Sequence, residues 1–526
     1  MECDYLIVGA GAAGCVLANR LSADPSNRVL LLEAGGSDLV DDVEMPFGQR
    51  NVVGNPATDW CFMAEPDPTR DGRVDMWSVG RVLGGGTSIN GLVWIRGQRR
   101  DYDDWAASGA TGWDYDSLLP YFRRSESFEG GADEYRGGDG PVSVSRLRTP
   151  HELVDVFVAA GVEAGFRANA DPNGADPEGF APVQTNQREG RRETAARAYL
   201  APVLDRPNLE IRTGAAVSRL LLEGERCTGV VTSGGELRAS REVVLSAGAI
   251  MSPKLLLLSG IGPRSELTEL GIEVVVEAEG VGRNLQEHPI TFVSFFVNVP
   301  TLNTMLLGDP DGCVEEWRRA GTGAMTSPVA QGYAFFRSDP SLDRPDLQFH
   351  FTPIGFDFGP DGLALHERPA CMIAANLCRP NARGTVTLRS TDPADPPRIS
   401  HELMGDADDV ARLAKGCEIA QRVFETEAFA PHLTEQQLPP APPSGPDEWA
   451  AYARATAGLA YHPSGTCRMG SDGGAVVDPS LRVRGVDGLR VVDASVMPRI
   501  VSANTNATVI AIGERASDLI LAGDDS

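Results

Sequence analysis

Lysine and long apolar runs are the features that this sequence has least of. Lys254 and Lys415 are the only lysines among 526 residues, and 73 acidic residues outnumber 47 basic ones, which gives a formal net charge of -26. Such an acidic surface repels phosphate backbones and anionic membranes, so we expect no nucleic-acid partner. The most apolar stretch, residues 243–262, is interrupted by three serines, a proline and a lysine, which excludes a membrane-spanning helix there.

Cysteine pairs are also missing. The nine cysteines are scattered and form no C-x-x-C motif, which excludes a small disulfide scaffold and predicts reduced thiols in the cytoplasm. The N-terminus carries no basic segment ahead of its first apolar run, so we predict no signal peptide. The seven histidines show no metal-ligand spacing and no G-x-S-x-G motif occurs, which argues against a metal site and against the commonest class of serine hydrolase.

The N-terminal segment predicts a dinucleotide-binding unit. An apolar run leads into Gly9-x-Gly11-x-x-Gly14, a helical stretch follows, and a second apolar run at 28–33 ends on Glu33. The first glycine permits a tight turn, the second lets the backbone approach a pyrophosphate, and the third allows close helix packing. Glu33 lies where a carboxylate accepts from both ribose hydroxyls and repels a 2'-phosphate, so the pattern indicates FAD or NAD rather than NADP.

The rest of the chain divides into two patterns, and its length suggests two or three domains. Further strands of the nucleotide-binding sheet are expected at 209–212, 217–222, 243–245 and 489–492, and a last helix at 508–521. The middle region, 296–460, predicts an antiparallel sheet with strands at 347–351, 370–377 and 385–388 and a helix at 408–424. The fold class is therefore α/β, with a doubly wound Rossmann-type domain and an α+β substrate domain built on an antiparallel sheet.

Five longer motifs resemble one enzyme family. Residues 80–90 (GRVLGGGTSIN) closely resemble the first signature of the glucose-methanol-choline (GMC) oxidoreductases, and residues 248–262 (GAIMSPKLLLLSGIG) resemble the second. The likeness continues in family order through 280–285 (GVGRNL), 462–470 (HPSGTCRMG) and 493–498 (DASVMP). These motifs span nearly the whole chain, which makes a chance likeness negligible.

The resemblance implies the cofactor and the domain boundaries. Residues 346–351 and 493–512 are similar to the choline dehydrogenase-like branch of the family, and members of the family bind FAD. Members with a covalent flavin have a histidine where this chain has Ile89, so we predict noncovalent FAD. We expect an FAD-binding domain from 1–155, 195–295 and 465–526, and a substrate-binding domain from 156–194 and 296–464.

The same resemblance implies which residues surround the cofactor. The segment from Asn90 to Val93 is expected to line the flavin, Val217 to meet the adenine through its backbone, and Asp493 to lie by the pyrophosphate. The full expected cofactor-binding set is Gly9, Gly11, Ala12, Ala13, Gly14, Glu33, Ala34, Arg81, Val82, Gly85, Thr87, Asn90, Gly91, Leu92, Val93, Val217, Ala247, Asp493, Ala494, Asn504 and Thr505.

His462 and Asn506 match the family's active-site pair. Oxidation of an alcohol removes the hydroxyl proton as hydride leaves carbon, which a neutral imidazole can do, so His462 is the expected base. Asn506 is expected to orient the alcohol oxygen, and Trp60 and Tyr461 to form walls of the substrate pocket.

Two positions depart from the family pattern. Glu287 stands where aspartate is common, and Thr508 stands where proline is common after the catalytic asparagine. We interpret His288, which follows Glu287, as structural.

The expected activity is FAD-dependent oxidation of an alcohol to an aldehyde or ketone, with hydride transferred to flavin N5. Three alternatives remain open: an oxidase that uses O2, a lyase similar to the hydroxynitrile lyases of this fold with structural FAD, and a noncatalytic flavin module. The substrate and the electron acceptor, whether quinone, carrier protein or O2, are not readable from the sequence. A quaternary ammonium substrate should find an anionic, aromatic-lined pocket.

Overall fold

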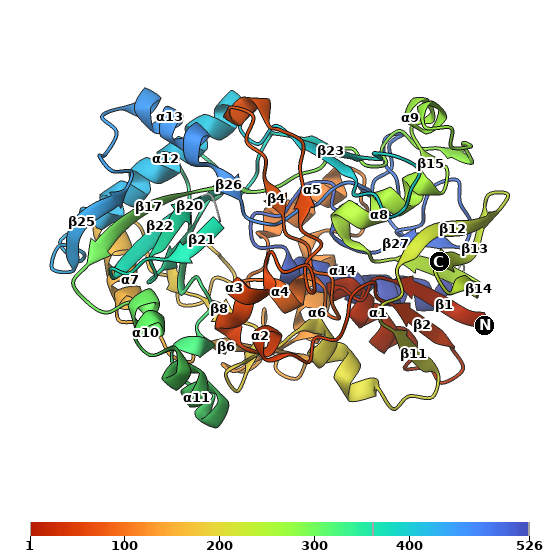
Figure 1. Ribbon diagram of the computed structural model, residues 1–526, viewed down its shortest axis with the longest axis horizontal. Coiled ribbons are helices and arrows are strands. Elements are labelled where there is room, and N and C mark those ends of the chain that lie inside the picture. The colour runs from red at the N-terminus through yellow and green to blue at the C-terminus, as the bar shows by residue number, and fades with distance from the viewer. Residues whose placement is uncertain (1, 360–361, 524–526) are drawn as a thin grey trace.

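The computed structural model describes residues 2–359 and 362–523 and contains two large sheets (Figure 1). The sheet on the right of the view contains strands from near both chain termini. The sheet on the left is built mainly from the middle of the chain. The two-part α/β fold predicted from the sequence is confirmed.

The right-hand sheet is the nucleotide-binding one. Its β1 and β2 are parallel neighbours joined by α1 (Ala12–Leu21), as the short crossover predicts. The strand order is β11-β2-β1-β14-β13-β12, with β27 parallel to β14. The strands are β1 (Glu2–Val8), β2 (Val29–Leu32), β11 (Leu209–Arg212), β12 (Val217–Glu223), β13 (Arg226–Thr232), β14 (Gly235–Leu245) and β27 (Leu489–Val491).

The left-hand sheet is antiparallel throughout. Its order is β25-β17-β22-β19-β18-β7, with β26 beside β17. The strands are β7 (Gly179–Pro182), β17 (Pro289–Val297), β18 (Gly332–Phe336), β19 (Leu347–Thr352), β22 (Ala370–Leu377), β25 (Leu433–Leu438) and β26 (Gly458–Leu459). Because side chains alternate along a strand, Phe349 and Phe351 pack with α12 (Ala407–Phe424) in one core, while Gln348 and His350 face the nucleotide-binding sheet.

Some predicted segments differ in pairing or bounds. The strand predicted at 385–388 is β23 (Gly384–Thr387), and it pairs with β24 (Arg398–His401) in a separate two-stranded sheet. Strand β17 of the left-hand sheet begins at Pro289, ahead of the boundary placed after residue 295. The domain boundaries therefore stay a prediction.

The last helix, α14 (Asn506–Leu521), returns the chain to the nucleotide-binding sheet. It crosses α1 closely at Gly513, where a Cβ would lie 3.0 Å from the Ala13 Cα atom. This crossing carries the segment before α14 to the turn between β1 and α1. Among the described residues, no helix combines the length and the apolar composition needed to cross a bilayer.

Candidate active site

Two glycine-rich loops form one cradle. In the turn between β1 and α1, a Cβ on Gly14 would lie 2.0 Å from the Gly9 carbonyl oxygen, and one on Gly9 would lie 2.5 Å from the Ser246 carbonyl oxygen. Gly85 of the second loop covers this turn, because a Cβ there would lie 2.7 Å from the Gly11 Cα atom. Side chains would fill this space, whereas glycines leave backbone N–H groups at the start of α1 open to a pyrophosphate.

Glu33 lies at the carboxyl end of β2, beside this cradle. Its Oε2 atom accepts the Ala10 N–H at 2.9 Å and its Oε1 atom accepts the Gly35 N–H at 2.7 Å. Burial raises the pKa of the Glu33 carboxyl, although these N–H groups act in the opposite direction. A hollow of about 420 Å³ next to it is lined by Ala34, Gly35, Gly36, Pro56, Ala57, Arg81, Thr213 and Gly214. Its size and position fit an adenosine group.

The predicted flavin-lining segment is a tightly held turn after α4 (Gly86–Ile89). Asn90 ends this helix, and its Oδ1 atom accepts the Leu92 N–H at 3.1 Å. Leu92 adopts a φ of 59°, the left-handed region that non-glycine residues rarely occupy. Val93 then pairs with Thr185 across an isolated bridge.

Most of the other residues predicted around the cofactor lie at the same edge of the sheet. The Asp493 Oδ2 atom accepts the Gly248 N–H at 2.9 Å and the Ser252 hydroxyl at 2.6 Å, which ties α8 (Gly248–Leu258) to the segment after β27. Ala247 precedes α8 directly, and Ala494 follows Asp493. Val217 begins β12, half-buried against the core, so both its expected adenine contact and a plain core role fit its place.

His462 lies in a chain of hydrogen-bonding side chains at the junction of the two sheets. Its Nδ1 atom is 2.9 Å from Nδ1 of His288, whose Nε2 atom is 3.0 Å from the Cys378 carbonyl oxygen. On the opposite side of the His462 ring, Nε2 is 3.1 Å from Nδ2 of Asn504. Gln348 and His350 of β19 hold Asn504 Oδ1 at 3.1 and 3.3 Å.

These contacts favour one arrangement of the ring protons of His288 and His462. A carbonyl oxygen can only accept, so His288 carries its proton on Nε2 and accepts through Nδ1. His462 must then donate through Nδ1, which leaves the lone pair on Nε2 facing the Asn504 amide. Burial lowers the pKa of His288 to about 4 and the pKa of His462 well below its ordinary value, so both rings are neutral, as the chain requires.

Glu287 fixes the backbone on both sides of this pair. Its carboxylate accepts the His288 N–H at 2.9 Å and the His462 N–H at 2.8 and 2.9 Å. Burial raises the pKa of Glu287 to about 8. Tyr461, just before His462, adopts a φ of 62°, and Glu287 holds the peptide that follows this strained residue. Although aspartate is common at position 287 in the family, the Glu287 side chain present here also positions the histidine.

Among the described residues, neither Asn506 nor Trp60 forms a hydrogen bond with His462. Asn506 begins α14, and both polar atoms of its side chain are buried with no hydrogen-bond partner among the described residues. Such orphaned groups fit a site that receives a ligand. Trp60 stacks on Phe62 at 5.5 Å and lies under the Arg81 guanidinium at 4.8 Å, which places it by the adenosine hollow. Tyr461 is 46% exposed beside His462.

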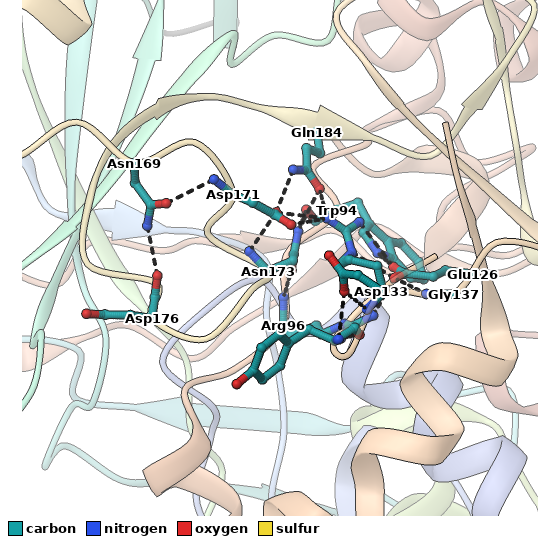
Figure 2. Close-up of polar contacts among 12 residues, drawn as sticks. Trp94, Arg96, Glu126, Asp133, Gly137, Asn169, Asp171, Asn173, Asp176 and Gln184 are labelled. Carbon is teal, nitrogen blue, oxygen red and sulfur yellow. Dashed lines mark hydrogen bonds and ion pairs between the residues drawn. The ribbon is translucent and has the colours of Figure 1, made fainter. Parts of the chain in front are cut away.

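A buried polar network ties residues 94–96, which follow the flavin-lining segment, to the loop around Asn173 (Figure 2). Asn173 accepts the Arg96 N–H at 2.9 Å and donates to the Trp94 carbonyl oxygen at 3.1 Å. To its right in the view, Glu126 accepts the Trp94 indole N–H at 2.8 Å and the Arg136 Nε–H at 2.8 Å, and pairs with Arg96. Burial alone would raise the pKa of Glu126, but the two guanidinium groups outweigh it and hold the pKa below its usual value.

Sequence reasoning missed two contacts of His462. We interpreted His288 as structural, yet its ring lies against His462. We expected Asn504 at the cofactor and Asn506 to orient the alcohol oxygen. The Asn504 side chain also reaches His462, and the role of Asn506 stays a prediction. The adjacency of His288 to Glu287 and the Asn504-Thr505-Asn506 spacing were visible, but neither shows which side chain turns toward the ring.

Comparisons with known proteins show the family of this chain. The family model for GMC oxidoreductase matches residues 3–290 with its N-terminal part and residues 380–513 with its C-terminal part. The oxygen-dependent choline dehydrogenase of Brucella anthropi is 40% identical over 529 residues, which cover 99% of this chain and 96% of that protein. The mitochondrial choline dehydrogenase of Homo sapiens is 42% identical over 534 residues, or 99% of this chain and 90% of that protein.

Solved structures show the same architecture. The pyridoxine 4-oxidase from Mesorbium loti superposes with a TM-score of 0.89 at 30% identity, covering 98% of each chain. A formate oxidase superposes with a TM-score of 0.91 at 26% identity, covering 99% of this chain and 98% of that one. The predicted family, the FAD cofactor and the class of reaction are confirmed: the chain belongs to the GMC oxidoreductase family and is an FAD-dependent oxidoreductase that acts on CH–OH donors.

Proposed function

We propose that His462 removes the hydroxyl proton of an alcohol while Asn504 holds the alcohol oxygen. The observation that carries this proposal is the chain from the Cys378 carbonyl through His288 to His462, because it leaves a lone pair on Nε2 beside an amide donor. An alcohol oxygen placed there accepts from Asn504 and donates to His462, so the 3.1 Å contact between these residues is exchanged for two hydrogen bonds. Bound FAD supplies the hydride acceptor.

The residues of the cradle fit that cofactor. Glu33 and the hollow beside Ala34 would hold the adenosine, and the open N–H groups at the start of α1 would bind the pyrophosphate. The turn from Asn90 to Val93 would border the flavin. Ile89 offers no atom for a covalent link, which supports noncovalent binding.

The two asparagines can be separated by mutation. We expect Asn504→Ala to lower kcat/KM about 10- to 100-fold, because it removes a donor that strengthens as the alcohol oxygen becomes negative. Asn506→Ala is expected to have the smaller effect, since among the described residues its side chain forms no hydrogen bond with His462. Steady-state kinetics with each variant checks this. A larger loss in Asn506→Ala would favour the assignment made from the sequence.

We further propose that the substrate is an uncharged alcohol. The face of the antiparallel sheet that carries Gln348 and His350 forms the wall opposite the cofactor. Among the described residues, most side chains on this face carry no charge: Ile290, Phe292, Ser294, Phe296, Tyr333, Phe335, Gln348, His350, Thr352, Ala370, Met372, Ala374 and Asn376. Glu435 of β25, opposite Phe296, is acidic, and it forms an ion pair with Arg368 at 2.7 Å. Glu287 is engaged by backbone N–H groups. A quaternary ammonium group would find aromatic rings on this wall, but the Glu435 carboxylate there is already paired with Arg368.

The pH dependence follows from the neutral state of the base. An ordinary imidazole has a pKa of about 6.5, and a protonated base accepts no proton. Because burial lowers the pKa of His462 well below that value, we expect the rate constant of flavin reduction to stay flat as the pH falls from about 7 to about 5.5, a range below the pKa of about 8 of Glu287. Anaerobic stopped-flow measurements across this range check it. An acid limb centred near the ordinary imidazole pKa would contradict the proposed environment of His462.

The visible spectrum of the purified holoenzyme tests the proposed function. Recorded without oxygen, it should show oxidised flavin that bleaches with one class of alcohol from a panel of choline, benzylic, aliphatic and sugar alcohols. We expect benzylic or aliphatic alcohols to bleach it and choline not to. Readmission of air then distinguishes an oxidase from a dehydrogenase that needs a quinone or a carrier protein. A flavin that no alcohol reduces, together with cyanohydrin cleavage, would establish the lyase instead.

The nine unpaired cysteines support a cytoplasmic location.

A further inference from the structure

Arg192 is a fully buried arginine that contacts neutral groups. It lies in β10 (Arg191–Arg192) with 0% of its surface exposed. Its Nε atom donates to the Val43 carbonyl oxygen at 2.9 Å, and Nη1 donates to the carbonyl and side-chain oxygens of Asn90 at 2.6 and 2.9 Å. Longer contacts of 3.4 Å reach the carbonyl oxygens of Thr87 and Pro46. Every acceptor is a neutral carbonyl or amide oxygen.

Other fully buried arginines of this chain have acidic partners. Arg136 pairs with Glu126 at 2.8 Å and Arg490 pairs with Glu242 at 2.8 Å. Among the described residues, no ion pair involves Arg192. A buried charge without a counter-ion is costly to keep, so its retention calls for a physical reason.

The carboxylates close to Arg192 in the chain or in space have other partners. Glu44 pairs with Arg191 at 2.6 Å, and Glu193 pairs with Arg188 at 2.9 Å. Asp38 accepts the Thr194 hydroxyl at 2.9 Å. The positive charge of Arg192 is therefore left unneutralised. Burial lowers the pKa of Arg192 to about 9, which still leaves the guanidinium protonated at neutral pH.

The charge lies directly behind the flavin-lining turn. Arg192 binds both ends of α4 through Thr87 and Asn90, and the loop ahead of α4 lies on the dinucleotide turn, with the Gly84 N–H donating to the Ala10 carbonyl oxygen at 2.8 Å. The Asn90 Oδ1 atom that accepts from Arg192 also accepts the Leu92 N–H. One short turn thus separates the guanidinium from the predicted cofactor surface.

We propose that Arg192 is a buried cation that raises the reduction potential of the flavin from behind this turn. The inference rests on the proposed function. Hydride transfer takes two electrons and one proton from the alcohol carbon to the flavin, while the hydroxyl proton goes to His462, so the flavin gains one negative charge. A fixed positive charge in a poorly polarisable site favours that charge, and the absence of a counter-ion keeps its field strong.

The test compares the midpoint potential of the bound flavin in four holoenzymes. Arg192→Gln removes the charge but keeps an amide donor, Arg192→Lys keeps the charge, and Arg191→Gln removes the neighbouring half-exposed charge that Glu44 already pairs. Each is titrated anaerobically against a reference dye. We expect Arg192→Gln to lower the equilibrium constant for flavin reduction at least tenfold, which is about 30 mV for a two-electron couple. Arg192→Lys at neutral pH and Arg191→Gln should match the wild type.

A wild-type potential in the Arg192→Gln holoenzyme would overturn the proposal and leave Arg192 as a tie between loops. If that variant does not retain FAD, the midpoint potential of the Arg192→Lys holoenzyme is measured at a series of pH values instead. A buried ammonium loses its proton at a lower pH than a guanidinium. The potential of Arg192→Lys should then fall below that of the wild type as the pH rises, and parallel curves would overturn the proposal. If the wild-type protein binds no FAD, the proposed function is wrong. This outcome differs from an unchanged potential, which would contradict only the role of Arg192.

Discussion

Substitution His462→Ala is expected to slow reduction of the flavin by alcohol about 10²- to 10⁴-fold, the usual range for loss of a general base. The Nε2 lone pair of His462 is the proton acceptor that the hydrogen-bonded chain through His288 leaves open. Without it, the hydroxyl proton must go to water as the hydride departs. Anaerobic stopped-flow absorbance in the flavin band measures this step directly and separates it from reoxidation.

The matched control is His151→Ala. That ring lies near the surface and contacts the Pro300 carbonyl oxygen, away from the proposed site. Its rate of flavin reduction should equal that of the wild type. The spectrum of bound flavin should be retained in His462→Ala, since no predicted cofactor contact is removed. A His462→Ala holoenzyme that reduces its flavin within tenfold of the wild-type rate would remove His462 from the role of base.

Substitution Glu126→Ala is expected to lower the free energy of unfolding by about 3–5 kcal/mol. Glu126 is fully buried between Arg96 and Arg136, which are also buried, and it accepts the Trp94 indole N–H. Removal of its carboxylate leaves two guanidinium groups close together in a site without water. Asp171 would remain as a partner of Arg136, at 2.8 Å, but it is too exposed to replace Glu126. Urea denaturation followed by circular dichroism measures the loss.

The control for this change lies three residues further along the chain. Glu129 pairs with Arg146 at 3.4 Å, and both side chains are largely exposed. Exposed pairs of this kind contribute about 1 kcal/mol or less, so Glu129→Ala should leave the denaturation midpoint almost unchanged. Equal midpoints for Glu126→Ala and the wild type would mean that the network of Figure 2 adds no stability.

The nucleotide-binding half could be predicted well because its signals are local. The glycines at 9, 11 and 14 and the acid at 33 belong to one strand–helix–strand unit, in which chain geometry fixes their relative positions. The strand predicted at 209–212 has those bounds in the structure. The strand predicted at 385–388 has a different partner from the one expected, because alternation predicts a strand but not its neighbour.

The proposed catalytic pair, His462 and Asn504, was harder to predict because it joins segments far apart in the chain. His462 meets His288 across 174 positions and Asn504 across 42. Asn504 and Asn506 are the same residue type two positions apart, and the turn into α14 decides which of them faces the ring. Hydrophobic periodicity in the sequence does not predict the backbone conformation of that turn. The buried charge of Arg192 is likewise invisible in a sequence with 47 basic residues, most of them arginine.

The sequence by itself determined the family and the cofactor, and it predicted His462 as the base, because glycine spacing and the family's motifs are properties of short contiguous segments. Only the tertiary structure decided which side chains hold that histidine, where its proton lies, and which buried arginine has no acidic partner. These depend on desolvation and on hydrogen-bond geometry between elements brought together by folding. Desolvation and the hydrogen bonds between these elements arise only when the two sheets pack together.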